Sequence, residues 1–116
     1  MEKKIALFAF NGDPMCFVHV LLNALDMKTR GYDVKLVIEG AATGLIPDLA
    51  SGASPLAGLF NKVREARLIS AVCKACSAKM NVLDKVAAAG LPLGEDMSGH
   101  PSMGNYMDEG YRVITF

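Results

Sequence analysis

The chain has 116 residues, of which 52% are hydrophobic and 21% are charged, a length that suits one domain with one core. Twelve basic residues balance twelve acidic ones, so the sequence lacks the basic surface that binds nucleic acid or an anionic membrane. No apolar run approaches the ~20 residues that span a bilayer, and the run 5–10 is too short for a secretory signal. We therefore expect one domain over residues 1–116, in the cytoplasm. The apolar composition, with seven Met, also indicates that an oligomer covers part of the surface.

Strand and helix signals alternate in the first half of the chain. The apolar run 5–10 predicts an interior strand covered on both faces, and apolar residues at helical spacing predict a helix over 15–30. Residues 34–38 predict a second strand, and residues 39–44 form the loop that leaves it. A cluster of Gly, Ser and Pro divides residues 45–67 into two short helices.

The alternation continues in the second half. The predicted elements are strands at 68–72 and 112–116, a helix at 77–89, an edge or irregular strand at 91–93, and a last helix from Pro101 or Ser102 to Asp108. Four or five short strands that alternate with helices predict an α/β fold in which helical layers cover a parallel sheet.

Functional sites of such sheets lie outside the carboxyl ends of the strands. The segments predicted at that rim are 11–16, 39–44, 73–76 and 97–102. They are far apart in the sequence, yet one rim would bring them together. We therefore expect Asn11, Glu39, Cys73 and His100 to approach one another.

Two of the three cysteines form the motif Cys73-Lys74-Ala75-Cys76 between a predicted strand and a predicted helix. A helix N-terminus carries about half a positive charge and unpaired N–H groups, and both lower the pKa of a cysteine. In a reducing compartment, two closely spaced thiols indicate catalysis or metal binding rather than a structural disulfide. We expect one thiol to act as nucleophile or sulfur carrier and the other to modulate or resolve it. The alternative is a pair of small buried hydrophobic side chains.

Neighbouring polar residues supply candidate helpers for these thiols. Lys74 would lower a thiol pKa by its charge, or it is simply solvated. His100, between Gly99 and Pro101, would act as a proton donor or thiolate partner, or it only hydrogen-bonds its neighbours. Glu39 would contact a ligand or provide a charge at a helix N-terminus.

Cofactor signals are weak in this sequence. Neither GxGxxG nor GxxxxGK[ST] occurs, so we expect no nucleotide cofactor. Zinc usually takes four ligands, and a second CxxC is missing; the residues that would just compose a site are Cys16, Cys73, Cys76 and His100. We expect no metal within one chain, although two subunits that share ligands would still provide the four that zinc needs. A thioredoxin-like oxidoreductase also uses CxxC at a helix start, and this activity ranks second.

Four segments together suggest a family. They are IALFAFNGDP, DVKLVIEGAATGLIPDL, LISAVCKACSAKMNV and DEGYRVITF. Along its whole length the chain resembles the DsrE/DsrF-like family of sulfur-relay proteins. The most specific part is VCKACSAKM, because the family carries its sulfur-accepting cysteine just after the third strand, which is Cys73 here.

The resemblance implies a three-layer α/β/α sandwich with a mainly parallel five-stranded sheet, assembled into trimers or hexamers. It implies a sulfurtransferase-like carrier: Cys73 takes sulfane sulfur from a donor protein as a persulfide and passes it to the thiol of an acceptor protein. No cofactor is needed for this exchange, which follows the rules of thiol and disulfide chemistry.

The chain departs from the best-known relay members at Cys76, where they often have a small apolar residue. Cys76 would release the sulfur by closing a disulfide with Cys73, or it would make the site redox-active or metal-binding. A second hypothesis is therefore a non-catalytic oligomeric protein that binds a metal or small ligand through the CxxC. Whether the chain is an enzyme stays open at this point.

Overall fold

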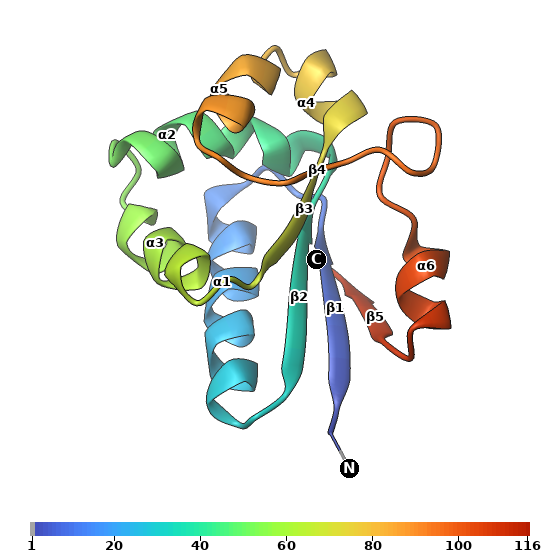
Figure 1. Cartoon of the computed structure of the whole chain (residues 1–116). Helices are drawn as coiled ribbons and strands as arrows, with labels where there is room; N and C mark the ends of the chain where they lie inside the picture. The colour runs from blue at the N-terminus through green and yellow to red at the C-terminus, as the bar shows by residue number, and fades with distance from the viewer. Residues whose placement is uncertain (1) are drawn as a thin grey trace.

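A computed structural model describes residues 2–116 (Figure 1). Five strands form one all-parallel sheet in the order β4-β3-β2-β1-β5. Their bounds are Lys4–Ala9 for β1, Asp33–Ile38 for β2, Ile69–Cys73 for β3, Leu93–Gly94 for β4 and Arg112–Thr115 for β5. The predicted α/β class and the parallel five-stranded sheet are confirmed.

Helices cover both faces of the sheet. They are α1 (Pro14–Thr29), α2 (Ile46–Ser51), α3 (Ala57–Glu65), α4 (Lys74–Lys79), α5 (Leu83–Ala88), α6 (Met103–Asp108) and the 3₁₀ helix η1 (Gly40–Leu45). In Figure 1, α1 and α3 lie on one side of the sheet, α6 lies on the other, and α4 and α5 lie near the end at which the strands finish. Among residues 2–116, no helix is both long and apolar enough to cross a membrane.

The two faces of β1 pack against different layers because successive side chains of a strand point in opposite directions. Ile5, Leu7 and Ala9 belong to the larger core, to which α1, α2, α3 and α5 also contribute. Ala6 and Phe8 belong to a smaller cluster on the opposite face, which Tyr106 of α6 covers. Burial on both faces confirms that β1 is an interior strand with a layer on either side.

The helix predicted over 77–89 is wrong in its bounds. Instead, α4 starts directly after Cys73, and a break at residues 80–82 separates it from α5. Asn81 has a positive φ of 59°, a left-handed conformation that ends the helix and that Asn tolerates better than most residues. Because α4 begins three residues earlier than predicted, Cys76 lies inside its first turn. The predicted loop 39–44 also differs, since most of it is η1.

Candidate functional site

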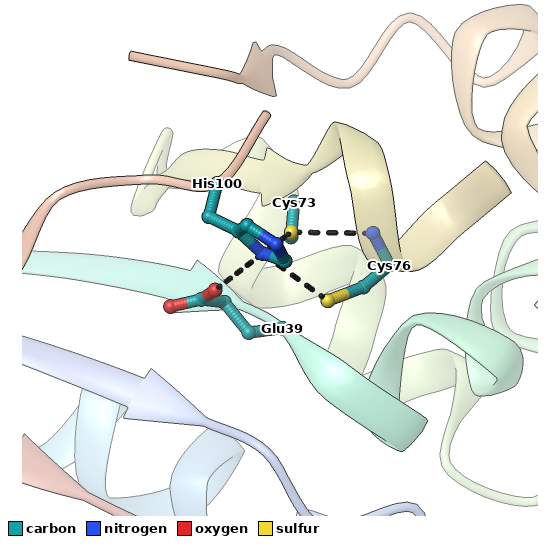
Figure 2. A group of neighbouring side chains, drawn as sticks. All are labelled: Glu39, Cys73, Cys76 and His100. Atoms are coloured by element: carbon teal, nitrogen blue, oxygen red, sulfur yellow. Dashed lines mark hydrogen bonds and ion pairs between the residues drawn. The ribbon is translucent and has the colours of Figure 1, made fainter. Parts of the chain in front are cut away.

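Four side chains meet at the carboxyl ends of the central strands (Figure 2). Cys73 is the last residue of β3, Glu39 follows β2, Cys76 lies in α4, and His100 lies between β4 and α6. One ligand atom from each residue lies within 4.8 Å of the others. We call Glu39, Cys73, Cys76 and His100 the rim cluster.

The position of Cys73 follows from its role as the N-cap of α4. Its backbone is extended, with φ of −60° and ψ of 120°, and its Sγ accepts a hydrogen bond from the Cys76 N–H at 3.3 Å. An N-cap side chain normally accepts such a bond through oxygen, and here sulfur takes that place. The Ser77 hydroxyl also donates to the Cys73 carbonyl at 2.7 Å. The sulfur is therefore fixed at the helix N-terminus by the turn that the CxxC itself forms.

His100 is held beside the two sulfurs by its own loop. Met97 and His100 exchange two backbone hydrogen bonds, of 2.8 and 2.9 Å. The Ala75 N–H donates to the Gly99 carbonyl at 2.9 Å and ties this loop to α4. The Nδ1 of His100 consequently lies 3.0 Å from the Sγ of Cys73 and 3.6 Å from the Sγ of Cys76.

Glu39 is a buried member of the rim cluster and is only 5% exposed. Its N–H donates to the Ala9 carbonyl at 2.8 Å, and its Oε1 lies 3.8 Å from the Nδ1 of His100. Burial raises the pKa of the Glu39 carboxyl, whereas a hydrogen bond with Cys73 and the charge of His100 act against that rise. The net result is a raised pKa, and the two neighbours that the carboxyl group faces limit the rise.

The expectation of a low pKa at Cys73 is wrong. Cys73 is 0% exposed, and burial raises the pKa of its thiol to about 12; the neighbouring Cys76 thiol and the Glu39 carboxylate add to the rise. The Cys76 N–H does lower the pKa, as a helix N-terminus should, but the loss of hydration outweighs it. Cys73 is therefore a protonated thiol at neutral pH, and a base must remove its proton before it can attack. The Nδ1 of His100, 3.0 Å away, is a nitrogen base within reach of the thiol.

Comparison with known proteins assigns the chain to a family. The sequence model of the DsrE/DsrF-like family matches residues 4–116, nearly the whole chain. The chain belongs to the DsrE/DsrF-like family. This confirms the resemblance seen in the sequence, and DsrE membership supports a sulfur-relay type of role.

Two relatives of this DsrE-family chain come from archaea, and both are uncharacterized. One, from Methanocaldococcus jannaschii, is 38% identical over 97 residues, which cover 84% of this chain and 77% of the relative. The other, from Archaeoglobus fulgidus, is 46% identical over 52 residues, which cover 45% of this chain and 85% of the relative. No solved structure matches the chain.

Two predicted helpers lie outside the rim cluster of this DsrE-family protein. Lys74 pairs with Glu95 at 3.2 Å, and both side chains are about half exposed. Asn11 accepts a hydrogen bond from the Asp13 N–H at 2.8 Å and lines a separate hollow with the exposed Cys16. Supporting roles for Asn11 and Lys74 stay predictions. In the set of possible metal ligands that the sequence suggested, Glu39 takes the place of Cys16.

Gly99 is a site residue that the sequence reasoning missed. Its carbonyl lies 3.7 Å from the Cys73 Sγ, and its φ of +89° is in the left-handed region that favours glycine. A Cβ at this position would also lie 3.1 Å from the Cβ of Ala75. The available signal was its place directly before His100, because a glycine there lets the loop approach α4 closely.

A mostly apolar hollow adjoins the rim cluster. Its volume is about 420 Å³, and its lining residues are Phe10, Glu39, Met97, His100, Pro101, Met103 and Gly104. Glu39 and His100 therefore have one side towards the two sulfurs and another towards this hollow.

Proposed function

We propose that this DsrE-family chain is a sulfur carrier in which Cys73 accepts sulfane sulfur as a persulfide and passes it to an acceptor thiol. The observation that carries the proposal is the 3.0 Å separation between the Cys73 Sγ and the His100 Nδ1 at the N-terminus of α4. A thiol of raised pKa becomes a nucleophile when a base lies within hydrogen-bonding reach. Family membership supports the relay type of role.

Loading begins with proton transfer from the Cys73 thiol to His100. The Cys73 thiolate attacks the terminal sulfur of a donor persulfide, a new S–S bond forms on Cys73, and the donor S–S bond breaks. The donor leaves as a thiolate and takes the proton from His100. Sulfur changes its carrier without net oxidation or reduction. The Glu39 carboxylate, 3.8 Å from the Nδ1, stabilises the imidazolium between these two steps.

Burial of Cys73 suits storage of the sulfur. The Cys73 Sγ touches His100 and Gly99, so a donor gains access only after the loop that carries these two residues moves. Once that loop returns, it slows the reaction of the persulfide with thiols in solution. The Cys76 N–H, which already donates to the Cys73 sulfur, also stabilises negative charge on the persulfide.

Unloading has two routes because Cys76 is present. An acceptor thiolate attacks the terminal sulfur, and the Cys73 thiolate leaves. Alternatively, the Cys76 thiolate attacks the Cys73 sulfur, which forms a Cys73–Cys76 disulfide and releases hydrosulfide; a dithiol must then reduce that disulfide. Cys76 is only partly buried and shares His100 with Cys73, which favours a resolving or tuning role.

The proposal also covers the cellular compartment and the partners of the protein. A carrier that needs reduced thiols belongs in the cytoplasm. Its partners are a sulfur donor protein, an acceptor protein and further copies of the chain in a trimer or hexamer, and the transfer uses no cofactor. The chain is then a sulfurtransferase in the sense of a stoichiometric relay.

A loading and unloading experiment tests this function. Metal-free, reduced protein is incubated with a small-molecule persulfide, desalted, and then mixed with an acceptor thiol. The carrier predicts that wild type and Cys16→Ser gain one sulfur atom per chain and lose it to the acceptor, whereas Cys73→Ser gains none. A Cys76→Ser protein should still load, and its persulfide should decay with less hydrosulfide. Equal loading of Cys73→Ser and wild type would reject Cys73 as the carrier.

A further inference from the structure

Three groups of the rim cluster point at one nitrogen atom. The Cys73 Sγ, the Glu39 Oε1 and the Cys76 Sγ lie 3.0, 3.8 and 3.6 Å from the Nδ1 of His100. An imidazole nitrogen carries either one proton or one lone pair, so it forms only one good hydrogen bond. In a catalytic triad the two partners of histidine use its two different nitrogens. Convergence on a single nitrogen therefore needs an explanation beyond a proton relay.

A cation between the four side chains explains this convergence. Zn²⁺ binds Cys sulfur, His nitrogen and carboxylate oxygen, usually four ligands in a tetrahedron. With Zn–S of about 2.3 Å and Zn–N and Zn–O of about 2.0–2.1 Å, neighbouring ligand atoms of a tetrahedron lie about 3.3–3.8 Å apart. Two of the three separations, 3.6 and 3.8 Å, lie within that range, and the third, 3.0 Å, is slightly shorter. Small movements of the Cys73 or His100 side chain would complete the geometry.

The ligand atoms are also held in advance by the backbone. The Cys76 N–H donates to the Cys73 Sγ, and the two hydrogen bonds between Met97 and His100 fix the histidine loop. Such outer contacts orient ligands and tune metal affinity. Cys73 and Glu39 are buried, whereas Cys76 and His100 are partly exposed, so a metal ion can enter from their side.

We propose that Glu39, Cys73, Cys76 and His100 form a mononuclear zinc site within one chain. The two thiols release their protons to solvent when the ion binds. Coordination to zinc withdraws electron density from the Cys73 sulfur and places the ion beside it, so zinc and a donor persulfide compete for Cys73. The inhibition of sulfur transfer by zinc rests on the proposed function, whereas the zinc site itself does not.

A cobalt and zinc titration tests the site. Chelator-treated, reduced protein receives Co²⁺, which reports thiolate ligands through charge-transfer absorption, and Zn²⁺ then displaces it in competition with a chromophoric chelator. We expect one ion per chain and the same affinity in Cys16→Ser and His19→Gln. We expect an affinity loss of more than about 100-fold in Cys76→Ser and His100→Gln, because removal of a ligand should exceed the 10–100-fold effect of losing an outer contact.

The outcomes separate this inference from the relay. If Co²⁺ gives no thiolate absorption, or if Cys76→Ser keeps wild-type affinity, the zinc site is wrong, whatever the metal-free protein does with persulfide. If Cys16→Ser weakens binding as much as Cys76→Ser, the ligand set is wrong. If zinc binds as expected but the metal-free protein takes up no sulfur, the site stands and the relay fails. Circular dichroism verifies that each variant folds; Cys76→Ser and His100→Gln keep the test valid should Cys73→Ser misfold.

Discussion

The Sγ of Cys73 and the Nδ1 of His100 lie 3.0 Å apart, although 27 positions separate the two residues in the chain. This contact joins the end of β3 to the loop between β4 and α6. It gives a buried thiol of raised pKa the base that it needs for sulfur exchange. It also makes the thiol and the imidazole available to one metal ion.

Replacement of His100 by Gln should slow persulfide formation on metal-free protein by about 100-fold or more, the usual contribution of a positioned general base. The matched control is His19→Gln, because the exposed His19 lies on α1 and lines the hollow that contains Cys16. The rate is measured at pH 7 from the mass of protein quenched at successive times. A His100→Gln rate equal to that of His19→Gln would show that His100 does not activate Cys73.

The burial of Cys73 predicts the order in which the thiols react. In folded, metal-free protein, a small alkylating reagent should modify the exposed Cys16 and the partly buried Cys76 at least about tenfold faster than Cys73. Peptide mapping after timed quenching measures the three rates. In denaturant the burial is lost and the difference should disappear. Fast modification of Cys73 in the folded protein would mean that the loop that carries Gly99 and His100 moves away from Cys73 readily.

Gly99→Ala should lower the free energy of unfolding by about 1–2 kcal/mol, since its φ of +89° is unfavourable for a residue with a Cβ. The contact with Ala75 should also push the His100 loop away from α4 and slow sulfur loading. Gly58→Ala is the control, because Gly58 lies in α3 and an added Cβ there meets no atom within 4 Å. Denaturant unfolding compares the two variants, and equal stability would contradict the role of Gly99.

Tyr111 should make stability depend on alkaline pH. Burial and a 2.7 Å hydrogen bond to Asp33 raise the pKa of the Tyr111 phenol above its ordinary value of about 10. The folded state therefore holds this proton longer than the unfolded state. Its contribution is fully present below about pH 10 and is lost as the pH rises towards the folded pKa.

The matched variant for this effect is Tyr111→Phe. Above about pH 10, the free energy of unfolding of wild type should fall more steeply than that of the variant, by up to about 1.4 kcal/mol per pH unit for one proton. Denaturant unfolding at several pH values measures both slopes. Parallel slopes would show that the Tyr111 proton is not linked to folding.

The sequence predicted β1, β2 and β3 well because each contains an apolar run, whereas β4 is only Leu93–Gly94 at the edge of the sheet. The sequence also placed Glu39, Cys73 and His100 at one rim, since parallel strands end on the same side of a sheet. The sequence left the burial of Cys73 open, as an alternative to a reactive thiol, because the burial depends on how the loop around Gly99 packs on α4. The helix error has a related cause: Asn81 has a left-handed φ of 59° between α4 and α5, a conformation that Asn tolerates but that residue type alone does not require.

The central claim is that Cys73 carries the sulfur, and peptide mass spectrometry tests it most directly. Metal-free, reduced protein is treated with a small-molecule persulfide, alkylated and digested. The mass of each cysteine-containing peptide is then determined. The account predicts that the Cys73 peptide gains one sulfur atom with the help of His100. The Cys16 peptide should retain none, because Cys16 is exposed and any persulfide formed on it is open to thiols in solution. Cys76 lies in the same stretch of chain, so fragmentation assigns the added atom to Cys73 or Cys76. Sulfur found only on Cys76 or Cys16, or on no cysteine, would contradict the account.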